Sequence, residues 1–344
     1  MNFIINTLAS VFVFSVVIFI HEFGHFIVAK KSGIKVNEFS IGMGPQLYGK
    51  TVGDTEYSIR ALPIGGFVAM EGEDEESDAE GSFNSVPVQS RIGVVIAGAV
   101  MNMVLGFLVL LYLTNMQTYI TSKTVSSFYE GAMTQQTGLQ IGDEIIAING
   151  RKCYIANDVI YEFARTQNGV ADFTVIRDGK EIELEDVTFE TYTDEETGLK
   201  QMVIDFTVEP ITKTVSTVLT EAANWTISLA RMVFLSLVDL ITGNVAINQM
   251  SGPVGIVSTI SEAVSYGIES VLMILAMITI NLGVFNLLPF PALDGGRLVF
   301  LLIELVRGKP IDQKYEMWVN GAGMLVLFAF MIFVTFSDIT RLFR

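Results

Sequence analysis

The chain has 344 residues, of which 51% are hydrophobic and only 17% are charged, and its mean hydropathy is +0.50. This composition excludes an ordinary soluble globular protein, in which about 25% of the residues are charged. The net charge of −16 argues against nucleic acid as a partner, and the single cysteine, Cys153, excludes an intrachain disulfide framework.

Four uncharged apolar stretches are long enough to cross a bilayer, which takes about 20 helical residues. They are Asn2–Ile20, Ile92–Leu113, Ser270–Leu293 and Met317–Ser337. The first has no basic residue before it and no small-residue cleavage site after it, so we expect a retained helix rather than a signal peptide. The expected fold class is a polytopic α-helical membrane protein with about four transmembrane helices.

The basic residues of the short loops predict the orientation, because Lys and Arg are retained on the cytoplasmic side. Two loops carry them: Lys30, Lys31, Lys35, Lys50, Arg60 and Arg91 follow the first stretch, and Arg297, Arg307, Lys309 and Lys314 precede the last. Both loops are therefore expected in the cytoplasm. Both termini and the segment 116–267, with 20 acidic and 9 basic residues, are expected outside.

The sequence His21-Glu22-Phe23-Gly24-His25 directly follows the first apolar stretch. Positions i and i+4 share one face of a helix, so both imidazoles can reach one metal ion, and Glu22 is placed to handle a bound water. Ionisable residues in a membrane span are costly and are usually functional. Zinc fits this ligand set best, although iron and cobalt remain open.

The acidic run Glu71–Glu80 is expected to be a solvated, mobile linker. Beyond the second apolar stretch, short β-type runs separated by turn signals predict a small α/β domain. These runs are Glu144–Ile148, Phe173–Ile176, Ile182–Leu184 and Met202–Val208. The segment Thr137–Gly150 of this domain resembles the PDZ domain of bacterial membrane and periplasmic proteases. PDZ domains bind a peptide strand at a sheet edge.

The stretch Val215–Val238 is apolar but is interrupted by Glu221 and Arg231, which favours an interfacial amphipathic helix over a fifth span. A loop along the membrane is expected from there to Ser261. The predicted organisation is 1–115 with two spans and a loop, 120–210 as the PDZ domain, 211–265 as the interfacial segment, and 266–344 with the last two spans.

A catalytic zinc with three protein ligands needs one more group, and the chain has no third histidine. A carboxylate is therefore expected. Asp294, in Asn286-Leu287-Leu288-Pro289-Phe290-Pro291-Ala292-Leu293-Asp294-Gly295-Gly296, is a better candidate than Glu38, because helix breakers leave it at membrane depth. Taken alone, Asp294 is explained somewhat better as a simple helix end.

These motifs together resemble the site-2 protease family of intramembrane zinc metalloproteases, most closely its bacterial RseP-like regulators of sigma-factor signalling. The resemblance covers nearly the whole chain and includes Gly42-Met43-Gly44 and Ser251-Gly252-Pro253-Val254-Gly255-Ile256. Two features depart from it. Ala99 follows Gly98 where bacterial relatives commonly have proline, and one PDZ domain stands in place of the tandem pair of some relatives.

The resemblance implies a role for each matching residue. It implies zinc ligands at His21, His25 and Asp294, a general base at Glu22, and substrate-binding residues at Asn286, Gly42, Gly44, Pro289 and Pro291. It also implies a membrane-associated β-hairpin over Tyr57–Met70, beside which an unwound substrate pairs as a strand.

The implied function is regulated intramembrane proteolysis in the bacterial cytoplasmic membrane. The expected substrates are single-span proteins of type II orientation, such as anti-sigma factors, and remnant signal peptides. The PDZ domain, expected outside the cytoplasm, would bind a peptide or the new substrate C-terminus. The alternative is a non-catalytic membrane adaptor with a structural metal, which the count of three ligands disfavours because structural zinc usually has four.

Overall fold

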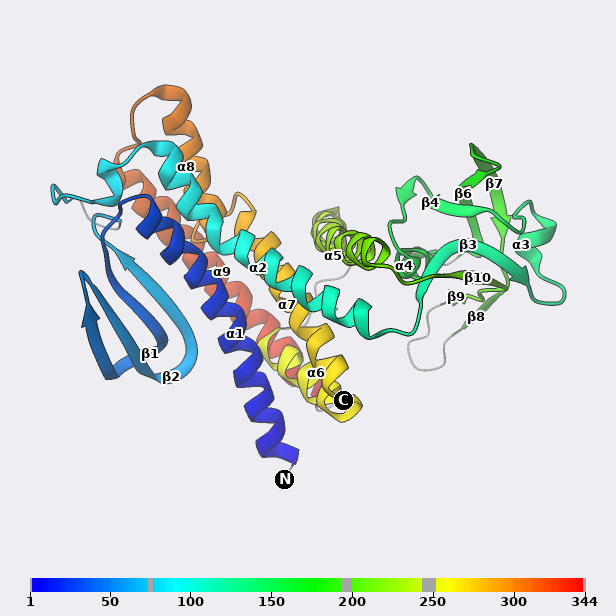
Figure 1. Ribbon diagram of the computed structural model, residues 1–344, viewed down its shortest axis with the longest axis horizontal. Helices are drawn as coiled ribbons and strands as arrows, with labels where there is room; N and C mark the ends of the chain where they lie inside the picture. The colour runs from blue at the N-terminus through cyan, green and yellow to red at the C-terminus, as the bar shows by residue number, and fades with distance from the viewer. Residues whose placement is uncertain (1, 74–76, 167, 194–199, 243–251, 343–344) are drawn as a thin grey trace. The chain divides into compact units, whose positions relative to one another are not determined.

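The computed structural model describes residues 2–73, 77–166, 168–193, 200–242 and 252–342 (Figure 1). The chain divides into two compact units. The helical unit comprises Met1–Val109 and Met232–Arg344, and the β-rich unit comprises Leu110–Arg231. Two long helices run from one unit into the other, α2 (Val88–Met116) and α5 (Val215–Thr242).

The helical unit contains α1, α6, α7, α8 and α9 besides its part of α2 and α5. Their bounds are Asn2–Lys31 for α1, Pro253–Tyr266 for α6, Ile268–Leu287 for α7, Asp294–Arg307 for α8 and Gln313–Leu342 for α9. Helix α1 contacts α6 and α7, and α6 packs on α9. Large apolar side chains such as Leu325 (73% exposed) and Ile332 (70%) point outward from α9, as expected where lipid is the solvent.

Within the described residues, five helices are long and apolar enough to cross a membrane: α1, α2, α5, α7 and α9. The four predicted spans lie in α1, α2, α7 and α9. Helix α1 begins with its predicted stretch, and α2, α7 and α9 begin before theirs. Helices α1, α2 and α9 also continue past the predicted end, whereas α7 ends at Leu287, before the predicted Leu293. The fifth is α5, for which the interfacial placement stays a prediction. The expected loop is wrong from Pro253 to Ser261, which are helical in α6, and residues 243–251 lie outside the described chain.

The loop between α1 and α2 forms a two-stranded sheet of long strands, β1 (Val36–Val52) and β2 (Thr55–Met70). Residues Glu38–Ile41 of β1 pair with β2 twice, once near 56–59 and once near 66–69. The hairpin expected within Tyr57–Met70 is therefore wrong in extent. That segment is one strand, and its partner strand is β1.

The described ends of the acidic run are held in place, so they differ from the free linker that the charge pattern predicts. Asn37 and Ser77 donate hydrogen bonds to the Glu71 carboxylate at 2.9 and 2.6 Å. Arg297 of α8 pairs with Glu73 at 2.5 Å. Polar contacts thus connect Glu71 to strand β1 and Glu73 to α8, the helix that carries Asp294.

The β-rich unit is built on a sheet with the strand order β10-β3-β4-β6-β7, with β5 paired to β4. The strands are β3 (Ile120–Phe128), β4 (Glu144–Ile148), β5 (Arg151–Lys152), β6 (Val170–Arg177), β7 (Lys180–Thr188) and β10 (Phe206–Ile211). Helix α4 (Ala156–Arg165) contacts β3 and β4. Burial raises the pKa of the Cys153 thiol in this core to about 12, which keeps it protonated.

Three of the predicted strands are present as β4, β6 and β7, the last two longer than expected. The fourth, Met202–Val208, is wrong as a single strand. Its residues divide between β9 (Lys200–Met202), which pairs with β8 (Thr191–Thr193), and β10, which pairs with β3. Met202 and Phe206 are both buried in the core, so one apolar run serves two strands with different partners.

The first half of α5 packs within the β-rich unit. A stripe with helical spacing is buried: Val218, Ala222, Trp225 and Leu229. Ser228 donates a hydrogen bond to Asp158 of α4, and the Arg231 guanidinium lies 5.3 Å from the Tyr154 ring centroid. The second contact uses Arg231, one of the charged residues that interrupt the apolar pattern of the helix.

Asp143 has a structural role in the segment that resembles a PDZ domain. Its side chain is fully buried and accepts two hydrogen bonds of 2.7 Å from Arg177. We expect Arg177→Leu to lower the free energy of unfolding by about 3–5 kcal/mol, since it leaves a buried carboxylate without its cation. Denaturation of the full chain in detergent measures this, with the exposed Lys180→Met as control. Equal stability of the two variants would contradict a structural role for the pair.

Candidate metal centre

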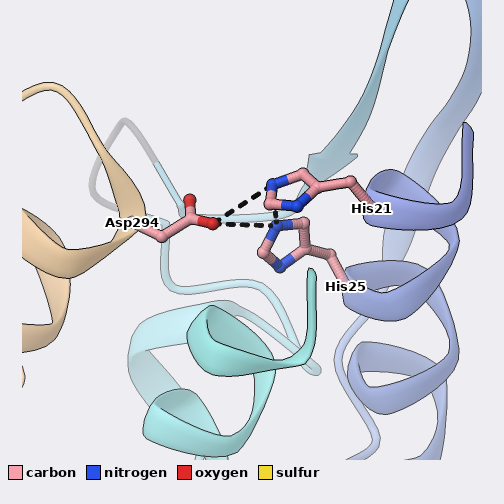
Figure 2. Close-up of side chains that lie close together, drawn as sticks. All are labelled: His21, His25 and Asp294. Carbon is pink, nitrogen blue, oxygen red and sulfur yellow. Dashed lines mark hydrogen bonds and ion pairs between the residues drawn. The ribbon is translucent and has the colours of Figure 1, made fainter. Parts of the chain in front are cut away.

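Two histidines of α1 lie one helical turn apart and face the same point in the helical unit (Figure 2). The Nε2 atoms of His21 and His25 are 3.2 Å apart, and each residue is only 8% exposed. Because α1 continues eleven residues beyond the first predicted stretch, to Lys31, the whole motif is helical. The i, i+4 spacing therefore places both rings on one face, as the sequence predicts.

Asp294 reaches the same point from the other side of the site. Helix α7 ends at Leu287, two residues before Pro289, and α8 begins at Asp294 itself. The Asp294 Oδ2 atom lies 3.2 Å from His21 Nε2 and 3.4 Å from His25 Nε2. The structure thus brings Asp294 to two histidines that lie more than 260 positions earlier in the sequence.

The turn before Asp294 requires the glycines that follow it. A Cβ atom on Gly295 would collide with the carbonyl of Leu288, and one on Gly296 would lie 2.5 Å from the Phe290 carbonyl oxygen. Ala292 in this turn has a φ of 72°, a conformation that L side chains rarely adopt. The two glycines therefore allow the first turn of α8 to lie against the backbone of the preceding turn, and this arrangement directs Asp294 toward the histidines.

The geometry of the three side chains fits a zinc ion. A tetrahedral site with bonds of about 2.0–2.1 Å has ligand-to-ligand distances of roughly 3.3 Å. The three distances between the two Nε2 atoms and Oδ2 are 3.2, 3.2 and 3.4 Å. Two imidazoles and one carboxylate leave a fourth position open, which is the arrangement of catalytic rather than structural zinc.

The hydrogen bond of His25 also fits metal binding. Its Nδ1 atom lies 2.8 Å from the carbonyl oxygen of Val94 in α2. A carbonyl oxygen only accepts, so Nδ1 carries the proton and a neutral His25 has its lone pair on Nε2. That lone pair is directed toward Asp294 and His21, as a metal ligand requires.

Glu22 lies on α1 between the two histidines and beside strand β2. The backbone of Val68 in β2 lies close to its carboxylate. A Cβ atom on Gly66 would lie 3.6 Å from the Glu22 Cγ atom and 2.8 Å from the Ser40 carbonyl oxygen. The glycine thus permits close approach of the strand to the carboxylate, which places the expected base next to an extended segment.

The residues expected to bind substrate occupy different places. Asn286, in the last turn of α7, is 8% exposed, and its Nδ2 atom lies 3.4 Å from His21 Nε2. Gly42 and Gly44 lie in β1 with φ values of 87° and 84° and have Leu62 of β2 as their neighbour.

The two prolines lie in the turn between α7 and α8. A Cβ atom on Gly323 of α9 would lie 2.8 Å from the carbonyl oxygen of Pro291, so this turn packs closely on α9. Pro289 follows the end of α7. Asn286 is thus the expected substrate residue that the structure brings to the histidines, and the prolines shape the turn that precedes Asp294.

Helix α2 also contributes to the site, and the sequence prediction did not include it. Val94 bonds to His25, Gly98 leaves room for both rings, and Asn102 lies 3.3 Å from His21 Nδ1. The available signal was the spacing of Gly98 and Asn102, which puts a small and a polar residue on one face of an apolar span.

Known proteins that are similar to this chain identify its family. Residues 9–330 match the model of peptidase family M50. The protein CPE1693 of Clostridium perfringens, whose name suggests a zinc metalloprotease, is 37% identical over 95% of this chain and 96% of its own length. The regulator of sigma-W protease RasP of Bacillus subtilis is 30% identical over 99% of this chain and all of its own length. Zinc metalloprotease RasP of Shouchella clausii is 31% identical, over 98% of this chain and its full length.

The chain belongs to peptidase family M50, the site-2 proteases. It is a multi-pass membrane protein and a zinc metalloprotease, which hydrolyses peptide bonds. The prediction of the family, the enzyme class and the metal from the sequence is confirmed.

Proposed function

We propose that this protease cleaves single-span membrane proteins of type II orientation within the bilayer, at the centre formed by His21, His25 and Asp294. The observation that carries the proposal is the set of distances of 3.2–3.4 Å among the three ligand atoms, on helices apolar enough to span a membrane. A hydrolytic centre in this position needs substrates that enter through lipid.

His21, His25 and Asp294 would hold the zinc ion, which supplies a water of lowered pKa and polarises the peptide carbonyl. Glu22 accepts the proton from the attacking water and returns it to the leaving nitrogen, as a general base and then a general acid. Asn286 donates a hydrogen bond from Nδ2 to the substrate backbone and so orients the scissile bond. Its position 3.4 Å from His21 supports this role.

The β1–β2 sheet is the proposed surface for the unwound substrate. A helical peptide bond is shielded by its own turn, so the substrate has to become extended before water can attack. Strand β2 passes Glu22 at Gly66 and Val68, and a substrate strand laid beside it would lie next to the base. Gly42 and Gly44 shape the sheet, while Pro289 and Pro291 shape the turn that precedes Asp294.

The substrates we expect are anti-sigma factors and remnant signal peptides. The sigma-W regulator function in the name of the Bacillus subtilis relative supports the first class. The protein would act in the bacterial cytoplasmic membrane, with a single PDZ domain over 120–210 outside the cytoplasm. That domain would bind a peptide or the new C-terminus of a trimmed substrate at a sheet edge.

Replacement of Asp294 tests the centre. We expect Asp294→Ala to reduce bound zinc from about one ion per chain to a small fraction, and to abolish cleavage of a reconstituted single-span substrate, because two imidazoles bind weakly without the carboxylate. Glu269→Ala is a matched control, since Glu269 is also an acid in the first turn of a helix but is exposed. Unchanged zinc in the Asp294 variant would show that another group completes the site.

A further inference from the structure

Asn102 is a polar side chain in the middle of an apolar helix and is completely buried. It lies one turn beyond Gly98 on the face of α2 that meets the histidines. Its backbone carbonyl accepts a hydrogen bond of 3.2 Å from Thr279 of α7, which fixes this part of α2 against α7. A buried amide in such a place is costly unless its polar atoms are used.

The side chain of Asn102 faces the ring nitrogen of His21 that does not point at the metal position. Its Nδ2 atom is 3.3 Å from His21 Nδ1, while its Oδ1 atom is buried and has no hydrogen-bond partner among the residues the structure describes. The oxygen and nitrogen of an asparagine amide are interchanged by a half-turn of the amide group. After that half-turn, Oδ1 faces Nδ1 of His21.

A metal-binding His21 requires the amide orientation in which Asn102 Oδ1 faces His21 Nδ1. When Nε2 of an imidazole donates its lone pair to a metal, Nδ1 carries the proton and needs an acceptor. His25 has such an acceptor in the Val94 carbonyl at 2.8 Å. Asn102 Oδ1 is in place to serve His21 in the same way, and doing so gives the buried oxygen a donor.

We propose that Asn102 is a positioning residue, whose side-chain oxygen accepts a hydrogen bond from His21 Nδ1 and thereby holds Nε2 toward the metal. The proposal rests on the proposed zinc site. Helix α2 then supplies the hydrogen-bond acceptor for each histidine, a backbone carbonyl for His25 and an amide oxygen for His21.

Zinc affinity of the purified full-length protein, measured in detergent by competition with a chelator, tests the role. We expect Asn102→Leu, which keeps the branched shape and removes the acceptor, to weaken zinc binding about 10–100-fold. Asn102→Asp keeps an acceptor oxygen and should restore affinity to within a few fold of the original. Thr114→Val is the control, because Thr114 is also fully buried on α2 but lies three turns away.

Nitrogen NMR of histidine-labelled protein provides a readout that packing alone would not change. The chain has only two histidines, so each ring can be assigned from the His21→Ala and His25→Ala variants. With zinc bound, Asn102→Asp should shift the Nδ1–H signal of His21 and leave that of His25 in place, because a carboxylate is a stronger acceptor.

Three results would overturn the role of Asn102: unchanged zinc affinity in Asn102→Leu, an equal loss in Asn102→Asp, or an unmoved His21 signal in Asn102→Asp. The last measurement does not depend on the stability of the leucine variant. Failure of the unmodified protein to bind zinc would instead overturn the proposed centre, so the two failures are distinguishable.

Discussion

Glu22→Gln should lower the rate of substrate cleavage by about 10²–10⁴-fold while bound zinc stays near one ion per chain. Glutamine keeps the shape of the side chain and its contact with β2 but cannot accept the proton of the attacking water. His21, His25 and Asp294 are unchanged, so the ligand geometry remains. Cleavage of a single-span substrate in proteoliposomes, with metal content measured on the same preparation, gives both quantities.

Glu80→Gln, at an exposed position of the acidic run, is the matched control and should cleave normally. Undiminished cleavage by Glu22→Gln would rule out Glu22 as the base. Loss of zinc together with cleavage would assign Glu22 to the support of the ligands instead. A chain that acts as an adaptor would keep its signalling role in this variant, whereas we expect that role to disappear with cleavage.

Gly98→Ala should strongly weaken zinc binding and should lower the rate of substrate cleavage by about 10²-fold. A Cβ atom at this position would collide with His25 Nε2 and lie 2.6 Å from His21 Cε1 and 2.8 Å from His21 Nδ1. Both rings would have to move, and displacements near 1 Å at a reacting centre cost about 10²-fold in rate. The zinc affinity, measured by competition with a chelator, and the rate of substrate cleavage should therefore fall together.

Gly93→Ala on the same helix is the control for this variant. Its new Cβ atom would meet only Val28 Cγ1, at 3.8 Å, which is an ordinary contact. Alanine favours a helix over glycine by about 1 kcal/mol at either position, so the difference between the variants reports the collision alone. Normal zinc affinity in Gly98→Ala would mean that α2 does not approach the rings as closely as the structure has it.

The spacing of residues along single helices was readable from the sequence. Apolar length predicted the helices that became α1, α2, α7 and α9, and the i, i+4 spacing put His21 and His25 on one face. Both follow from the geometry of one helix, which depends only on local positions. The prolines and glycines around Asp294 likewise predicted a helix break, because they act on the backbone nearby.

Contacts between distant segments were decided by the tertiary structure. Whether Asp294 is a ligand or a helix end depends on where α8 begins relative to α1, which no local pattern contains. The double pairing of β1 with β2, and the split of one apolar run between β9 and β10, depend on partner strands. The contacts of Val94 and Asn102 with the two histidines depend on the packing of α2 against α1.

The sequence by itself therefore determined which residues could form a zinc centre and that they belong to a membrane protein. Only the tertiary structure determined that the Nε2 atoms of His21 and His25 and the Oδ2 atom of Asp294 lie within 3.4 Å of one another, and that α2 packs beside them. The physical reason is that ligand type and helical face are local properties of the chain. Distances between helices are set by how their small and large side chains pack together.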